Sequence, residues 1–366
     1  MTFAEIGLHP AILKALTDSG YSEPTPVQQQ AIPAALAGRD LMVSSQTGSG
    51  KTAAFMLPAL HLFASQERPA ATTRAGDRRP AHARQRFQAA QPKMLVLTPT
   101  RELALQVTAA TEKYGRQLHH LRAVAILGGM PYPKQMELLG RNPEILVATP
   151  GRLIDHMSSG KIDFSQLQIL VLDEADRMLD MGFIEDIERI VAATPASRQT
   201  LLFSATLDGT VGELAQRMTR TALRLQVDAV SARHDNIEQR MHFIDDLAHK
   251  NRLLDHLLRD VSIGQALVFT ATKRDADTVS DRLNVAGLNA AALHGDMHQG
   301  ARNRTLTAMR RGQVQILVAT DVAARGIDVP TITHVFNYDL PKSAEDYVHR
   351  IGRTGRAGRS GLAISL

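Results

Sequence analysis

The 366-residue chain contains no cysteine and no tryptophan. Without cysteine it can form neither disulfides nor thiolate zinc sites, which suits a reducing compartment. Long apolar runs are also missing: the longest uncharged apolar stretch, Ala53–Ser65, is too short to span a bilayer and contains Pro58 and His61. The first ten residues, MTFAEIGLHP, lack the basic start and apolar core of a signal peptide. We therefore expect a soluble, cytoplasmic, monomeric protein with no membrane contact.

Charge is nearly balanced, with 42 basic and 37 acidic residues, but it is unevenly distributed. The segment from Gln66 to Lys93 carries seven basic residues against Glu67 and Asp77, which accounts for the whole net charge of +5. It is rich in Ala, Pro, Gln and Thr and has no apolar period, so we expect a mobile loop. Two interpretations stay open: a solvated insertion, or a basic arm that contacts nucleic-acid phosphates.

Six continuous apolar runs end abruptly in polar residues, with helix-period segments such as Arg101–Leu118 and Ala276–Ala286 between them. Runs without alternation are typical of strands buried on both faces of a parallel sheet. The pattern predicts a doubly wound α/β fold with functional residues at the carboxyl ends of the strands. The runs are Met94–Thr100, Ile145–Pro150, Ile169–Glu174, Thr200–Thr206, Ala266–Thr272 and Ile316–Asp321.

The runs fall into two groups, separated by the polar segment Gln226–Gln239. This spacing predicts a first domain over 1–227, a linker over 228–236 and a second domain over 237–366. The chain stops at the strand-like GLAISL, so we expect the second domain to be truncated at its C-terminal end.

The stretch SSQTGSGKT, Ser44–Thr52, follows a short apolar run and opens a helix-period segment, which is the context of a phosphate-binding loop. Ser45 stands where the common pattern has glycine, so a Gly/Ser turn formed by chance is the alternative. Glycines let backbone N–H groups converge, the lysine reaches phosphates and the threonine hydroxyl ligates magnesium. The predicted nucleotide-binding residues here are Ser45, Gln46, Thr47, Gly48, Ser49, Gly50, Lys51 and Thr52.

An acidic pair, Asp173 and Glu174, ends another predicted strand. Beside a phosphate loop, Asp173 can hold magnesium together with Thr52, and Glu174 can orient or deprotonate an attacking water. Alone, such a pair is more often a solvated helix start. Its combination with Gly-Ser-Gly-Lys-Thr favours nucleotide hydrolysis.

Taken together, these strings resemble the DEAD-box ATP-dependent RNA helicases, and the resemblance covers nearly the whole chain. They occur in the order typical of that family: GYSEPTPVQ (Gly20–Gln28), SSQTGSGKT, PTRELA (Pro99–Ala104), GG (Gly128–Gly129), TPGR (Thr149–Arg152), DEAD (Asp173–Asp176), SAT (Ser204–Thr206), VFTAT (Val268–Thr272), QGAR (Gln299–Arg302), ATDVAARGID (Ala319–Asp328) and HRIGRTGRAG (His349–Gly358).

The resemblance implies two tandem RecA-like domains with an interdomain cleft, and ATP and Mg²⁺ as cofactors. Gln28 would read adenine, with Tyr21 and Phe3 near the base, although Phe3 could instead pack against Leu8 or Ile12. Gly326 and Asp328 would contact the nucleotide. Arg353 and Arg356 would act as arginine fingers, and His349 would couple the sites, so that catalysis would involve Lys51, Thr52, Asp173, Glu174, His349, Arg353 and Arg356.

The same resemblance implies an RNA site that grips the backbone without reading sequence, which agrees with an aromatic content of only 4% and no evident stacking platform. Ser204 and Thr206 would link it to the nucleotide site. Ribosome-assembly or RNA-decay proteins are conceivable partners. Alternatives to an RNA-unwinding ATPase are an ATP-gated RNA clamp and a DNA translocase; the literal DEAD and GYSEPTPVQ strings argue against the translocase. The expected RNA contacts are Pro99, Thr100, Arg101, Gly129, Thr149, Gly151, Arg152, Thr270, His294, Thr320 and Asp321.

Fourteen histidines occur without metal-ligand spacing, and we expect them on the surface or in helices.

Overall fold

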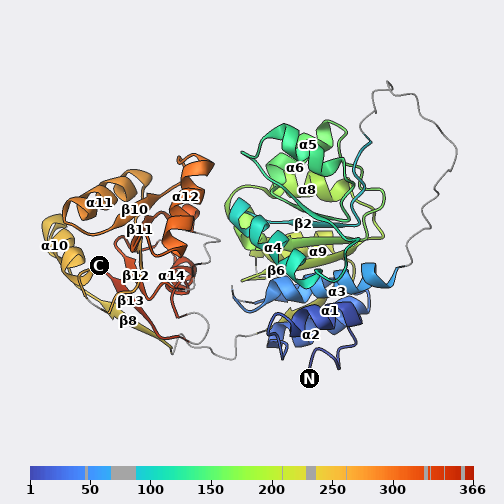
Figure 1. Cartoon of the computed structure of the whole chain (residues 1–366), viewed down its shortest axis with the longest axis horizontal. Helices are drawn as coiled ribbons and strands as arrows, with labels where there is room; N and C mark the ends of the chain where they lie inside the picture. Colours follow the sequence, from blue (N-terminus) through green and yellow to red (C-terminus); the bar gives the residue numbers. More distant parts are fainter. Residues whose placement is uncertain are drawn as a thin grey trace. The chain divides into compact units, whose positions relative to one another are not determined.

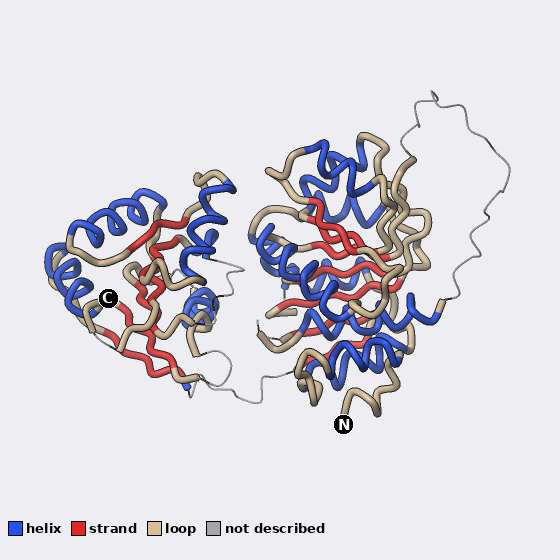
Figure 2. Tube along the Cα trace, in the orientation of Figure 1, coloured by secondary structure: helices blue, strands red, loops and turns tan. Residues whose placement is uncertain are grey.

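The computed structural model describes residues 1–45, 48–66, 88–207, 209–227, 236–260, 262–324, 329, 331–341, 343–355 and 359–366. The chain divides into two units, Met1–Ala229 and Val230–Leu366, each built around its own sheet (Figure 1). Figure 2 shows the strands of each unit as a layer between helices. No described helix is both long and apolar enough to cross a membrane.

The first unit contains a seven-stranded sheet in the order β3-β4-β2-β5-β6-β1-β7, and every pairing is parallel. Its strands are β1 (Leu41–Ser44), β2 (Met94–Leu97), β3 (Ala123–Ile126), β4 (Ile145–Ala148), β5 (Ile169–Asp173), β6 (Gln199–Ser204) and β7 (Leu223–Gln226). Its helices are α1 (Pro10–Thr17), α2 (Pro26–Leu36), α3 (Lys51–Ser65), α4 (Arg101–Tyr114), α5 (Tyr132–Leu139), α6 (Pro150–Ser158), α7 (Ala175–Asp180), α8 (Ile184–Ala192) and α9 (Gly209–Met218).

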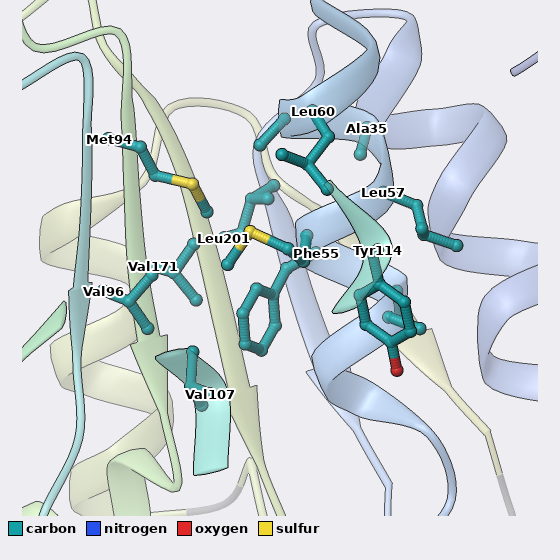
Figure 3. Packing of buried hydrophobic residues seen from close by; sticks show 14 of the residues in the cluster. Ala35, Phe55, Leu57, Leu60, Met94, Val96, Val107, Tyr114, Val171 and Leu201 are labelled. Atoms are coloured by element: carbon teal, nitrogen blue, oxygen red, sulfur yellow. The ribbon is translucent and has the colours of Figure 1, made fainter. Parts of the chain in front are cut away.

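Both faces of this sheet are buried, because successive strand residues enter different hydrophobic clusters. In β5, Val171 joins a cluster with α1 to α4, whereas Leu170 joins a second cluster with α5 to α9. Figure 3 shows Phe55 of α3 beside Val171 and Leu201 of the sheet, and its ring meets that of Phe203 edge-on at 5.3 Å. Burial on both faces explains why the apolar runs do not alternate.

The second unit contains a six-stranded parallel sheet in the order β10-β11-β9-β12-β13-β8. Its strands are β8 (Ile237–Met241), β9 (Ala266–Phe269), β10 (Ala290–Leu293), β11 (Ile316–Ala319), β12 (His334–Asn337) and β13 (Gly361–Ser365). Its helices are α10 (Leu247–Leu257), α11 (Lys273–Val285), α12 (Gln299–Arg310), α13 (Asp321–Ala324) and α14 (Ala344–Ile351). Clusters with α10 and α11 and with α12 and α13 cover the sheet.

The predicted doubly wound α/β class is confirmed, and all six apolar runs contain strands. Helix α4 ends at Tyr114 rather than near Leu118, because Gly115 caps it and the Leu118 N–H bonds the Gly115 carbonyl, three residues back instead of four. The ends of the expected linker segment, Gln226 and 237–239, belong to strands β7 and β8; residues 228–235 lie outside the described part.

The expectation for the histidines is wrong at two positions. His334 is buried within β12, and His294 is buried directly after β10, so neither lies on the surface or in a helix. The basic segment 67–87 lies outside the described residues.

Candidate functional site

A glycine-containing turn joins β1 to α3 at the carboxyl edge of the first sheet. Gly48 and Gly50 have φ values of 87° and 93°, the left-handed region that glycine adopts without strain. A Cβ atom on Gly50 would also lie 2.4 Å from Nε2 of Gln28, so a side chain there would force the Gln28 amide to move. Two predicted loop residues, Gln46 and Thr47, lie outside the described part of the chain.

Ser45 is the anchor of this turn. Its N–H donates to the Ser204 carbonyl at 3.0 Å, its carbonyl accepts from Nζ of Lys51 at 3.0 Å, and its hydroxyl accepts from Ser49 Oγ at 3.2 Å. The hydroxyl contact is one that glycine or alanine could not make. Ser45 and Lys51 are both buried, and Thr52 is half-buried next to the lysine.

The acidic pair lies two strands away, because β6 separates β5 from β1. Asp173 is buried, and burial raises the pKa of its carboxyl to about 7, although the charge of Lys51 opposes the shift. Its Oδ1 has no hydrogen-bond partner among the described residues. Glu174 has a left-handed backbone with φ 54°, which is strained for a non-glycine residue and directs the chain into α7.

Two hydrogen bonds tie the acidic strand end to β6. The N–H of Asp176 donates to Ser204 Oγ at 3.3 Å, and Asp176 Oδ2 accepts from the Ala205 N–H at 3.3 Å. Thr206 follows and is partly exposed. Ser204 therefore contacts both the loop, through its carbonyl, and the acidic segment, through its hydroxyl.

These residues fit a magnesium–nucleotide complex. Asp173 and Thr52 offer hard oxygen donors, and the unpaired, buried Oδ1 of Asp173 is an atom that a cation would satisfy. No group of three or more His, Asp or Glu side chains forms a complete metal site in the part that the structure describes. A bound cation would thus need further oxygens from a phosphate ligand.

Gln28 connects α2 to the loop. Its Oε1 accepts from the Thr25 N–H at 3.0 Å, which caps the helix start, and its Nε2 donates to the Gly50 carbonyl at 3.0 Å. Tyr21 is 40% exposed, with the Lys113 ammonium 4.7 Å from its ring centre. Phe3 is instead buried in the same cluster as Leu8 and Ile12, the packing alternative left open by the sequence.

The expected RNA residues of the first unit converge at the ends of β2, β3 and β4, which are neighbours. Gly129 has φ 69°, and a Cβ atom there would lie 2.3 Å from an Arg101 guanidinium nitrogen, so the arginine packs directly over this turn. Arg152 donates to the Met130 carbonyl at 3.2 Å. Thr149 precedes α6, Gly151 is exposed in its first turn, and Pro99 is buried.

Gln135, which the sequence did not single out, fixes the turn after β3. The buried amide accepts from the Leu127 N–H at 3.1 Å and donates to the Met130 carbonyl at 2.9 Å. A glutamine on a helix ordinarily faces solvent, so no local signal could have identified it.

The second unit repeats the strand-end geometry of the first. Thr98 and Thr270 each donate a backbone N–H to the neighbouring strand, at 3.0 Å in both, and each hydroxyl bonds the carbonyl two residues on, at 3.2 and 3.3 Å. Thr149 and Thr320 likewise each donate at 3.3 Å to the next strand. Both Thr98 and Thr270 are fully buried, so at these strand ends the hydroxyl bonds the chain itself.

Asp321 and His294, two expected RNA contacts, have protein partners in this structure. Arg350 binds Asp321 in a bidentate pair, Nε to Oδ1 at 2.6 Å and the second nitrogen to Oδ2 at 2.7 Å. His294 Nε2 lies 3.0 Å from Asp277 Oδ1. Arg350 also lies 4.9 Å over the Phe269 ring and is buried.

Arg350 was missed at the sequence level, because its partner lies 29 residues away. Arg353 is buried just after α14, and His349 lies on that helix, partly exposed. Arg356, Gly326 and Asp328 lie outside the described residues.

Comparison with known proteins identifies the family. The family description "DEAD/DEAH box helicase" matches residues 25–214, and "Helicase conserved C-terminal domain" matches residues 249–358. The chain is 43% identical to the ATP-dependent RNA helicase SrmB of Escherichia coli K12, over 100% of this chain and 78% of SrmB. It is 43% identical to the ATP-dependent RNA helicase DeaD of Mycobacterium tuberculosis H37Rv, over 99% of this chain but only 60% of DeaD.

Solved structures agree. Saccharomyces cerevisiae Dbp5 bound to RNA and ADP BeF3 matches with a TM-score of 0.83 and 33% identity, over 100% of this chain and 88% of that one. Mss116p bound to ssRNA and AMP-PNP matches with a TM-score of 0.84 and 30% identity, over 99% of this chain and 73% of that one. Both units thus have the RecA-like architecture. The chain belongs to the DEAD-box family of ATP-dependent RNA helicases.

Proposed function

We propose that this chain hydrolyses ATP in response to RNA and uses the cycle to separate short RNA duplexes locally, without regard to sequence. The observation that carries the proposal is the convergence of Lys51, Asp173 and Ser204 at one sheet edge. Asp173 and Ser204 end the adjacent strands β5 and β6, and Lys51 begins the helix after β1, the next strand, where its charge acts on Asp173. SrmB and DeaD carry the name ATP-dependent RNA helicase, which supports the same activity here.

In the proposed nucleotide site, the backbone N–H groups of Gly48, Ser49 and Gly50 and the start of α3 face the phosphates. Lys51 leaves the Ser45 carbonyl and pairs with phosphate oxygens. Gln28 offers its remaining amide hydrogen and lone pair to the adenine edge while it keeps its contact with Gly50. Tyr21 and Phe3 lie near the base in this proposal; Tyr21 is 40% exposed, and Phe3 is buried in the cluster that contains Leu8 and Ile12.

Magnesium, held by Thr52 and Asp173, would neutralise charge on the phosphates. Its binding requires the ionised form of Asp173, and the elevated pKa of about 7 means that proton and cation compete for this carboxyl. Glu174 holds and deprotonates the attacking water. Glu174 directly follows β5, and its left-handed backbone turns the chain into α7.

We further propose that the two units, with the bounds 1–227 and 237–366 and a linker over 228–236, close on ATP. Arg353 and Arg356 then contact the phosphates from the second unit. Gly326 and Asp328 contact the nucleotide, and His349 couples the nucleotide and RNA sites. An arginine finger typically raises the rate of phosphoryl transfer about 10³–10⁵-fold. Ser204 and Thr206 relay closure, because Ser204 contacts both the loop and the acidic segment.

The proposed RNA site uses the strand ends of both units. The residues there are small residues, hydroxyl residues and a few arginines, which suit a sugar–phosphate backbone. Dbp5 and Mss116p were solved bound to RNA, which supports the assignment. The expected contacts remain Pro99, Thr100, Arg101, Gly129, Thr149, Gly151, Arg152, Thr270, His294, Thr320 and Asp321.

An ATP-gated RNA clamp with little unwinding is the alternative. The presence of Glu174, Arg353 and Arg356 favours turnover over a static clamp. Cytoplasmic location, a monomeric state and ribosome-assembly or RNA-decay partners stay proposals, as does Mg²⁺ as the cation.

ATPase assays with single-stranded RNA, with DNA and without nucleic acid test the function. We expect stimulation by RNA alone; equal stimulation by DNA, or none by RNA, would overturn it. Glu174→Gln should bind ATP and RNA yet lose about 10²–10⁴ in hydrolysis rate. A duplex-separation assay distinguishes unwinding from clamping, because a clamp retains RNA without releasing the displaced strand.

A further inference from the structure

Tyr132 begins α5 with an unusually exposed ring. The residue is 39% exposed, and its ring stacks on that of His156 from α6, with centroids 4.6 Å apart and planes 11° from parallel. One face of the tyrosine is therefore covered by the imidazole. The remaining exposure leaves ring surface open to solvent.

His156 behaves as a flat support in this stack. It is fully buried, and neither ring nitrogen has a hydrogen-bond partner among the described residues. Burial lowers its pKa, and the nearby charge of Arg152 lowers it further, so the ring is neutral at physiological pH. A buried imidazole without hydrogen bonds is costly, and such groups in native structures call for an explanation. Holding Tyr132 in place supplies one.

The stack borders the proposed RNA site. Tyr132 lies three residues after Gly129, whose turn packs against Arg101, and two after Met130, whose carbonyl accepts from Arg152. Lys134, two residues further along the chain, is exposed and basic. His156 lies one turn after Arg152 on α6, and the charge of Arg152 lowers the pKa of His156, so the stack lies close to this expected RNA contact.

We propose that Tyr132 is a stacking site for one base of the bound RNA strand and that His156 is its positioning residue. The inference rests on the proposed RNA site. It adds a contact to a base, whereas every other expected contact is to the backbone. Stacking on an aromatic ring tolerates any base, so the contact agrees with sequence-independent binding. The imidazole behind the ring fixes its plane before RNA arrives, which lowers the entropy cost of stacking.

A purely structural role is the competing explanation. In that case Tyr132 serves only to pack α5 on α6, and substitutions change stability without changing RNA affinity selectively. The two explanations differ in their dependence on bases, which an RNA backbone without bases can separate.

The test compares oligo(A) with an abasic ribose-phosphate oligomer of equal length. Tyr132→Ala should weaken oligo(A) binding about five- to twentyfold, at the lower part of the range for loss of one stacked base, and leave abasic affinity unchanged. Tyr132→Phe should bind both as the wild type does. Equal losses on both RNAs, or none on either, would overturn the inference.

A fluorescence readout follows from the absence of tryptophan. Tyr132→Trp introduces a single reporter, which oligo(A) should quench and the abasic oligomer should not. Phe243→Trp, at a position 91% exposed in the second unit and outside the proposed sites, is the matched control. Quenching of both reporters alike, or of neither, counts against stacking.

His156 is tested through the same comparison. His156→Ala should reduce oligo(A) affinity selectively, and His156→Phe, which keeps a flat ring, should restore it. If neither variant differs from the wild type between the two RNAs, the positioning role is wrong. Wild-type protein that binds neither RNA would refute the proposed function itself, whereas wild-type binding with unchanged variants refutes only the stacking site.

Discussion

The Lys51 ammonium lies 3.0 Å from the carbonyl oxygen of Ser45, six residues before it in the chain. The lysine that we expect to bind phosphate is hydrogen-bonded to the loop itself. Ser45 also receives the Ser49 hydroxyl at 3.2 Å, so both contacts hold the loop in one conformation. A nucleotide must therefore displace Lys51 from Ser45 when it binds.

Ser45→Ala should raise affinity for ADP about two- to tenfold. The substitution removes one hydroxyl–hydroxyl bond, worth roughly 0.5–1.5 kcal/mol, from the nucleotide-free loop but leaves the carbonyl in place. Titration with a fluorescent ADP analogue measures the change. Ser49→Ala should give the same gain, and the double variant no more, because the two hydroxyls form one bond.

Ser44→Ala is the matched control for this prediction. Its hydroxyl donates to the Ala205 carbonyl at 3.0 Å and makes no recorded bond to the loop. We expect its ADP affinity to match the wild type. Unchanged or weaker ADP binding by Ser45→Ala would show that the bond is not specific to the empty loop.

Gln28→Ala should both relax the preference for ATP over GTP and lower stability by about 0.5–2 kcal/mol. The stability loss follows because Oε1 caps α2 at the Thr25 N–H. Competition binding with ATP and GTP, together with thermal unfolding, separates the two effects. Gln28→Glu keeps an oxygen for the cap but loses the donor to Gly50, so it should retain more stability than selectivity.

The neighbouring Gln29 offers a control, since among the described residues its Nε2 donates only to the Pro24 carbonyl. Gln29→Ala should leave nucleotide selectivity intact. Selectivity that survives in Gln28→Ala would refute base reading by Gln28.

Arg350→Ala should destabilise the protein by about 1.5–3 kcal/mol, because it removes the charge-assisted hydrogen bonds of the buried Arg350 to Asp321, whose side chain is 30% exposed. Arg350→Lys keeps the positive charge but loses the bidentate geometry, so its stability should lie between those of the wild type and Arg350→Ala. Urea denaturation monitored by circular dichroism measures the loss. Arg240→Ala removes an exposed pair with Glu238 and should cost much less stability than Arg350→Ala. Similar losses in both would contradict the assigned role of Arg350.

Stability should fall as pH drops below about 6.5, and His156 should contribute to the fall. Burial lowers the pKa of His156 in the folded protein below its ordinary value of 6.5, so the unfolded chain binds the proton more readily. The stabilising effect of the neutral ring is complete above pH 6.5 and declines as pH falls, by at most about 1.4 kcal/mol per pH unit.

His156→Phe cannot titrate and should show a shallower loss of melting temperature between pH 7.5 and 5.5. Burial also lowers the pKa of His334 and of His61, so part of the wild-type loss should persist. Identical pH profiles for the variant and the wild type would rule out a contribution from His156.

The fold was predictable because burial on both sheet faces leaves a local signature, the continuous apolar run. Each of the six runs contains a strand, and Thr98 and Thr270 directly follow strands β2 and β9. The nucleotide loop was equally readable, since Gly48 and Gly50 serve backbone needs that only glycine meets easily.

Individual side-chain contacts were not predictable. The ion pair of Arg350 with Asp321 and the hydrogen bond of Gln135 to the Leu127 N–H depend on which segments the fold brings together. The stack of Tyr132 on His156 joins residues from different helices, so neither ring is distinguished locally. The low aromatic content gave no indication that an exposed tyrosine borders the expected RNA site.

The buried hydroxyls of Thr98 and Thr270 have an evolutionary consequence. Each hydroxyl bonds the carbonyl two residues on, and each N–H donates to the neighbouring strand, so both residues fix the course of the chain from strand to helix. The outer faces of the helices that follow, α4 and α11, take no part in these bonds. A strand end fixed in this way can be inherited almost unchanged while those outer faces vary.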